Sequence, residues 1–79
     1  MRIELYLYAT LAKYLPPSAK NKSVVLTLPD GDTVKQALAA LQVPTGKVKL
    51  IFVNGVHARL DSALSDGDRI GAFPPVGGG

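Results

Sequence analysis

Residues 49–73 read KLIFVNGVHARLDSALSDGDRIGAF, and this stretch decides the fold that the sequence predicts. Its apolar run Lys49–Val53 has the composition of a strand, and Asn54-Gly55 follows directly. An Asn-Gly pair is a strong hairpin signal because both residues tolerate the positive φ of a tight turn. Val56–Arg59 is therefore expected to return as a short partner strand.

Three further strands are predicted on either side of this hairpin. After the Asp66-Gly67 turn, Arg69–Phe73 has the composition of a last strand. Toward the amino end, Ile3–Tyr8 and Ser23–Leu28 place apolar side chains at every second position, which is the period of a strand. Because the first strand has large side chains on both faces, we expect it to lie inside the sheet, next to the second strand.

One main helix is predicted between the second and third strands. Thr33 followed by Gln36 fits a capping box, and Pro44 is expected to stop the helix near Gln42. A short second helical turn is expected at Leu11–Leu15. The order strand, strand, helix, strand, strand, strand predicts an α+β fold: a mixed sheet of four to five strands with one main helix and a short second helix.

The composition limits the chain to one small domain. Its 79 residues are 47% apolar and 19% charged, which predicts a folded domain over residues 1–75 and a flexible glycine tail over 76–79. The sequence has no cysteine and one histidine. Disulfides, thiolate nucleophiles and the usual zinc ligand sets are thereby excluded, and a cytoplasmic protein without catalysis of its own is expected.

Charge patterning does not predict a nucleic-acid or membrane partner. Nine Lys and Arg against six Asp and Glu give a net charge of +3, and the basic residues are scattered along the sequence. The apolar start, residues 1–15, is interrupted by Glu4 and Lys13 and is too short to span a bilayer. Asp30-Gly31-Asp32 and Asp66-Gly67-Asp68 fit tight turns better than calcium ligands.

The sequence ends on Val76-Gly77-Gly78-Gly79, which cannot form a packed element. Each glycine would lose maximal backbone freedom and has no side chain to bury. A carboxylate on bare glycines is an unhindered acyl group that fits a narrow channel in another protein. Taken alone, however, such a run is more typical of a frayed terminus, so its interpretation depends on the rest of the chain.

The whole chain resembles one family. Residues 53–79, VNGVHARLDSALSDGDRIGAFPPVGGG, resemble the C-terminal half of the small subunit of molybdopterin synthase and its ubiquitin-like sulfur-carrier relatives. LAKYLPP, at residues 11–17, resembles the family's first short helix. The most specific part is the ending: Phe73, Pro-Pro-Val, one variable residue and Gly78-Gly79. The resemblance implies the ubiquitin-like β-grasp fold, in agreement with the predicted element order.

The resemblance also implies a covalent sulfur carrier for molybdopterin biosynthesis. A partner adenylating enzyme would use ATP to form an acyl-adenylate on the Gly79 carboxylate, and a sulfur donor would convert this into a thiocarboxylate. The large subunit of molybdopterin synthase would then receive Gly78 and Gly79 and present the sulfur to the pterin precursor, whose dithiolene later holds molybdenum or tungsten. No cofactor is expected to bind stably; the adenylate and the thiocarboxylate are covalent intermediates.

The predicted partner interface combines the approach to the tail with three residues elsewhere. These residues are Phe73, Pro74, Pro75, Val76, Gly77, Tyr6, Tyr8 and Arg59. Phe73 is expected to pack against the partner while the diproline directs the tail outward. The tyrosines fit either the core or sheet edge, or a partner-facing patch on the sheet face that the helix leaves open. Arg59 fits an acidic partner groove or a solvated strand position, and the small Gly71 and Ala72 predict a weak or bulged last strand.

Three alternatives remain open. The same carrier chemistry would serve another sulfur acceptor, such as the thiamine thiazole, a sulfur amino acid or a thiolated tRNA. A ubiquitin-like modifier would join the activated Gly79 to a protein lysine. A passive binding module, such as a small RNA-binding β-grasp domain, would leave the tail without a role, although the modest net charge argues against it.

Overall fold

The computed structural model describes residues 1–75, and its elements follow the predicted order. The elements are β1 (Arg2–Leu7), η1 (Ala9–Tyr14), β2 (Ser23–Thr27), α1 (Val34–Ala40), η2 (Thr45–Lys47), β3 (Leu50–Val53), β4 (Val56–Ala58) and β5 (Arg69–Phe73). The predicted short second helix is present as the 3-10 helix η1, whereas η2 was not predicted. The strand boundaries lie within two residues of those expected.

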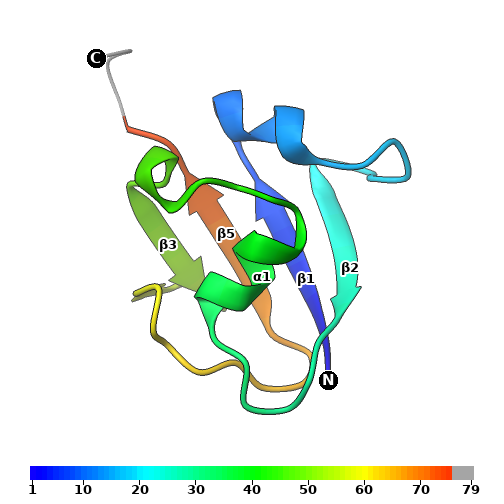
Figure 1. The fold of residues 1–79 in the computed structure, drawn as a ribbon, viewed down its shortest axis with the longest axis vertical. Helices are drawn as coiled ribbons and strands as arrows, with labels where there is room; N and C mark the ends of the chain where they lie inside the picture. The colour runs from blue at the N-terminus through cyan, green and yellow to red at the C-terminus, as the bar shows by residue number, and fades with distance from the viewer. Residues whose placement is uncertain (76–79) are drawn as a thin grey trace.

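The strands form one five-stranded mixed sheet in the order β2-β1-β5-β3-β4. β1 and β5 are parallel, and every other pair in the sheet is antiparallel. As predicted, β1 lies inside the sheet and pairs with β2, while β5 joins β1 to β3 at the centre. Helix α1 lies across one face of the sheet (Figure 1). The predicted α+β architecture is therefore confirmed.

The core lies between α1 and the covered face of the sheet. In β1 the buried residues Ile3, Leu5 and Leu7 alternate with more exposed ones, and β5 contributes the fully buried Ile70. Leu38 of α1 is also fully buried. Because burying one aliphatic side chain of this size contributes about 1.5–3 kcal/mol, this layer is the main stabilising contact between helix and sheet.

Both ends of α1 are closed by local hydrogen bonds. At the start, the Thr33 backbone N–H donates to the Gln36 side-chain oxygen at 2.7 Å, which confirms the predicted capping box. At the other end, Gln42 adopts a left-handed φ of 60°, and the Val43 N–H donates to the Leu38 carbonyl at 3.0 Å. This Schellman-type end stops the helix at Ala40, two residues before the predicted position.

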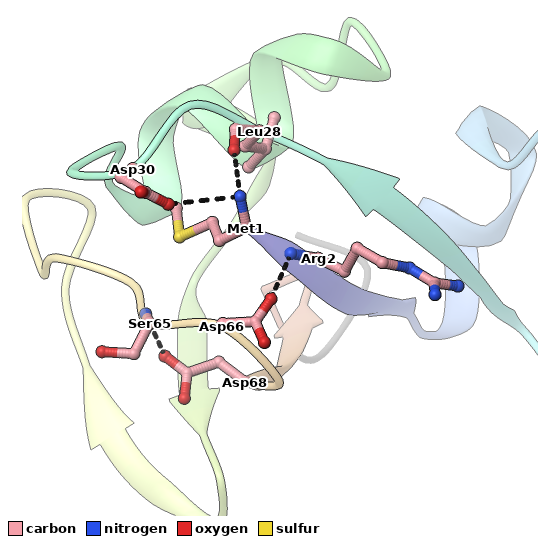
Figure 2. Close-up of polar contacts among 7 residues, drawn as sticks. All are labelled: Met1, Arg2, Leu28, Asp30, Ser65, Asp66 and Asp68. Atoms are coloured by element: carbon pink, nitrogen blue, oxygen red, sulfur yellow. Dashed lines mark hydrogen bonds and ion pairs between the residues drawn. The ribbon is translucent and has the colours of Figure 1, made fainter.

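The aspartate-rich turns are held by backbone contacts, as Figure 2 shows. The Met1 amine donates to the Leu28 carbonyl at 2.7 Å and lies 3.3 Å from a carboxylate oxygen of Asp30. Asp66 accepts the Arg2 N–H at 2.7 Å. Since these carboxylates serve the turns and the start of β1, the turn interpretation is supported, and within residues 1–75 no cluster of acidic or histidine side chains could hold a metal ion.

Candidate functional site

The predicted reactive tail follows directly from the central strand of the sheet. β5 ends at Phe73, whose carbonyl accepts the Lys49 N–H at 2.8 Å. Pro74 and Pro75 come next, and neither has an N–H to extend a strand ladder. The half-buried Pro74 and the exposed Pro75 are therefore a fixed stop at the end of β5.

The reactive group predicted from the sequence lies outside the described residues. It consists of Gly78 and Gly79, and the predicted interface residues Val76 and Gly77 lie outside the described residues as well. What the structure describes is the surface from which residues 76–79 continue.

Four aromatic side chains form a continuous band on the sheet face opposite α1. Tyr8 and Phe73 stack with their ring centres 4.5 Å apart and their planes 9° from parallel. Tyr6 lies 6.1 Å from Tyr8, and Phe52 meets Phe73 edge-on at 5.9 Å. These are favourable offset-stacked and T-shaped geometries, and we refer to these four residues as the aromatic face.

The aromatic face answers the question that the sequence left open for the two tyrosines. Leu5 and Leu7 of β1 are fully buried toward the helix, and Tyr6 and Tyr8 alternate with them along the strand. Both tyrosines are only half-buried. They therefore belong to the open face of the sheet and not to the core, while partner binding there stays a prediction.

Gly71 allows the rings of the aromatic face to pack closely. A methyl group added at Gly71 would lie 3.3 Å from Cε2 of Tyr8 and 3.7 Å from Cε1 of Phe73. In the strand register Gly71 is opposite both Tyr6 and Phe52. The expected bulge is wrong: β5 is continuous and paired on both sides, and the rings of Tyr8 and Phe73 occupy the space beside Gly71.

An open hollow of about 760 Å³ lies along the aromatic face and ends at a polar rim. Asn54 fixes this rim: its side-chain amide donates to Asp68 at 2.8 Å, and its oxygen accepts the Arg69 N–H at 3.0 Å. The Arg69 guanidinium lies 3.7 Å from the Glu4 carboxylate. The hollow thus has aromatic walls near the end of β5 and paired polar groups near its start.

Arg59 does not join the aromatic face. It follows β4 instead of ending it, is exposed, and lies 3.6 Å from the exposed Asp61. Its side chain borders a separate shallow hollow together with Thr33 and Lys35. The structure therefore brings together Tyr6, Tyr8 and Phe73 but leaves Arg59 elsewhere.

Phe52 is a member of the aromatic face that sequence reasoning did not identify. Its ring also meets His57, which is exposed as expected, at 5.8 Å and nearly perpendicular. The available signal was its alternation with the buried Ile51 within the predicted strand. Alternation alone places a residue on a face, but the neighbours on that face depend on the strand order.

In residues 1–75 we find no helix with both the length and the apolar character needed to cross a membrane.

A mixed sheet that holds one helix, with a parallel pair formed by the first and last strands, defines a small ubiquitin-like β-grasp domain. The chain belongs to the Mut7-C ubiquitin family, whose model matches residues 1–77. No curated protein matches the sequence closely enough to count as a relative. The family match confirms the ubiquitin-like resemblance drawn from the sequence.

Solved structures agree with this assignment. The chain is similar to SAMP1 from Haloferax volcanii, with a TM-score of 0.74 and 28% identity over 100% of both chains. It is also similar to a putative molybdopterin converting factor subunit 1 from Pyrococcus furiosus, with a TM-score of 0.67, 24% identity, and coverage of 95% of this chain and 98% of that one.

A third similar structure is a complex of subunits 1 and 2 of the molybdopterin-converting factor from Helicobacter pylori. One chain of that complex matches with a TM-score of 0.62 and 23% identity, and the match covers 100% of this chain and 100% of that chain. At these identities the two molybdopterin-related structures show the fold alone. Together with the family match, they establish a β-grasp domain with the fold of ubiquitin-like sulfur carriers and modifiers.

Proposed function

We propose that this protein is a sulfur carrier that acts as the small subunit of molybdopterin synthase. The sulfur would be carried on the C-terminal carbonyl of Gly79. The observation behind the proposal is the junction at the end of β5. There the central strand ends in the aromatic face at Phe73, and Pro74-Pro75 link it directly to the Val-Gly-Gly-Gly ending. A recognition surface next to an unhindered acyl terminus is the arrangement that a carrier requires.

The proposed chemistry needs no catalytic side chain from this chain. The Gly79 carboxylate attacks the α-phosphorus of ATP, and pyrophosphate leaves. Sulfide equivalents from a donor then attack the acyl carbon, the bond to AMP breaks, and a thiocarboxylate remains. Its sulfur is polarisable and anionic near neutral pH, so it is a better nucleophile than the carboxylate that it replaces.

Two partner proteins follow from this proposal. An adenylating enzyme would form the mixed anhydride, and the large synthase subunit would receive the thiocarboxylate. The Helicobacter pylori complex of subunits 1 and 2 supports the second partner, because its fold matches this chain over its full length. We assign the aromatic face and Pro74-Pro75 to the contact with these partners, since aromatic side chains are enriched at interfaces.

A second candidate function is protein modification through the same activated Gly79. The similarity to SAMP1, a small archaeal modifier protein, supports it over the full length of both chains. A modifier and a carrier share the adenylation step and differ in the nucleophile that follows, which is a lysine amine in one case and a sulfur donor in the other. Carriers for other sulfur acceptors differ only after the thiocarboxylate has formed.

Intact mass spectrometry separates these possibilities. The protein is incubated with ATP, the adenylating enzyme of the same organism and a sulfur donor, and a variant lacking Gly79 serves as the control. We expect the exchange of one oxygen for sulfur on the C-terminal residue of the full chain and no change in the variant. Isopeptide adducts on other proteins would favour the modifier, and an unchanged mass of the full chain would refute both functions.

A further inference from the structure

Five lysines that are far apart in the sequence share one end of the molecule. They are Lys13, Lys20, Lys22, Lys47 and Lys49, and all five are exposed. We call this surface the lysine end. It is the end at which β5 stops and from which Pro74 and Pro75 continue.

The topology of the sheet gathers these lysines. β1 and β5 run parallel and finish at the same end, where β2 and β3 begin (Figure 1). Lys13 lies in η1, directly after β1, and the Lys22 carbonyl accepts the N–H of Leu7, the last residue of β1. On the other side, the Lys49 N–H donates to the Phe73 carbonyl, and Lys47 ends η2 two residues earlier.

The positive charge of the lysine end is not neutralised within residues 1–75. All ion pairs found in this part of the chain involve other residues: the Met1 amine with Asp30, Arg59 with Asp61, and Arg69 with Glu4. Five of the six acidic residues lie in the loops toward the opposite end, namely Asp30, Asp32, Asp61, Asp66 and Asp68, whereas Glu4 lies within β1 and accepts the Ser23 hydroxyl at 2.9 Å. Together with the four other basic residues, these six acidic residues give the rest of the chain a formal charge of −2, against +5 at the lysine end.

The two ends act as separate electrostatic surfaces. The six residues of β1 span about 17 Å, which exceeds the Debye length of ~10 Å at 0.1 M salt. A partner that approaches the lysine end is therefore screened from most of the opposite negative charge. It meets five lysines around the only covalent route to Gly79.

We infer that the lysine end steers the chain onto an acidic protein surface surrounding the channel that takes up the C-terminal glycines. This inference rests on the proposed function, because it names the chemistry of the partner that activates Gly79. Four residues beyond Pro75 reach at most ~14 Å when extended, so the partner must approach this end closely. Carboxylates around the channel mouth would then lie opposite the lysines and orient the encounter.

The charge pattern favours a protein partner over RNA. Non-specific binding of single strands uses aromatic rings with free faces, whereas Tyr8 and Phe73 already stack on each other at 4.5 Å. Planar arginine forks suit phosphate groups, but the lysine end contains no arginine. Compact, flexible lysine charges are suited to steering, which raises the association rate more than it slows dissociation.

A pair of matched charge reversals tests the inference. K20E/K49E changes both sides of the lysine end, and R2E/K35E changes exposed basic residues elsewhere. Each pair shifts the net charge from +3 to −1, since each reversal removes two units. Both variants are assayed by ATP–pyrophosphate exchange with the adenylating enzyme, at about 0.1 M and about 1 M salt.

We expect K20E/K49E to lower kcat/KM about tenfold at the lower salt concentration while kcat stays unchanged. The deficit should shrink below about twofold at the higher concentration, where the Debye length is ~3 Å. R2E/K35E should stay within about twofold of the unaltered chain at both concentrations. Circular dichroism of each variant establishes that it is folded before the rates are compared.

Four results would overturn the inference. Equal losses in both variants would indicate a net-charge effect, and no loss in either would remove the steering role while leaving the proposed function intact. Salt-sensitive binding of a fluorescein-labelled oligouridylate that only K20E/K49E abolishes, together with unchanged enzyme kinetics, would assign the lysine end to RNA. If the unaltered chain supports no exchange and gains no sulfur, the proposed function fails and the inference fails with it.

Discussion

Replacing Phe73 by alanine tests whether the aromatic face stabilises the fold as well as offering a binding surface. Its ring is half-buried, and the centre of the ring lies 4.5 Å from that of Tyr8 and 5.9 Å from that of Phe52. Truncating a fully buried Phe costs about 3–5 kcal/mol, so about 2–3 kcal/mol is expected for this partly exposed ring. Each aromatic pair accounts for about 0.5–1.5 kcal/mol of that loss.

The assay is urea unfolding followed by far-UV circular dichroism on Phe73→Ala, Tyr8→Ala and the double variant. With an m value of about 1 kcal/mol/M for a chain of this size, the Phe73 variant should unfold at a midpoint about 2–3 M lower. The double-mutant cycle should give a coupling energy near 1 kcal/mol between the two rings. Phe73→Leu, which keeps an apolar side chain without a ring, should lose about 1 kcal/mol.

A coupling energy within about 0.3 kcal/mol of zero would refute this reasoning, because independent sites add to within that error. The stacked geometry would then be a consequence of strand pairing and not a source of stability. In that case Phe73 would be available to a partner at no cost to the fold.

Three further predictions concern the helix end, the sheet centre and the tail. Gln42→Gly should raise the unfolding free energy by about 0.5–1 kcal/mol in urea melts, because Gln42 has a φ of 60°, which glycine adopts more readily; a loss of stability would contradict the left-handed conformation at this position. Gly71→Val should lower stability by about 1–3 kcal/mol and change the near-UV tyrosine signal, because the added Cβ alone would lie 3.3 Å from Cε2 of Tyr8; an unchanged spectrum would show that the ring moves freely. Deleting Gly79 should abolish sulfur loading in the mass assay, and a thermal midpoint lowered by more than about 4 °C would instead assign Gly79 a structural role.

Local signals in the sequence were sufficient for most of the elements. Asn54 and Gly55 adopt the positive φ values of 53° and 80° that a tight hairpin requires, and β3 and β4 pair on either side of them. The capping box placed the start of α1 at Val34. The end of α1 was less accessible, because Gln42 in the left-handed conformation is an uncommon substitute for glycine and has no distinctive pattern.

The candidate site could be predicted only in part, because the residues that meet in it come from three different strands. Phe73 was identified from the resemblance and the tyrosines from the sheet face that one helix leaves open, but their contact depends on the parallel pairing of β1 with β5. Phe52 enters the same face through the pairing of β3 with β5. Gly71 was misjudged for the same reason: its small size weakens an isolated strand, but next to Tyr8 it provides room for a ring.

The lysines show how topology creates a surface that the linear sequence does not reveal. Along the chain they come from three separate stretches, Lys13, Lys20 with Lys22, and Lys47 with Lys49, so no window contains a run of charge. Because β1 and β5 are parallel, they finish at the same end of the sheet. The connection that follows β1 and the tail that follows β5 therefore start at that same end. Any basic residues in those connections then surround the start of the tail. The proposed carrier chemistry uses no catalytic side chain from this protein, so its specificity would depend on recognition, and this fold places both proposed recognition surfaces, aromatic and basic, where the chain leaves the sheet.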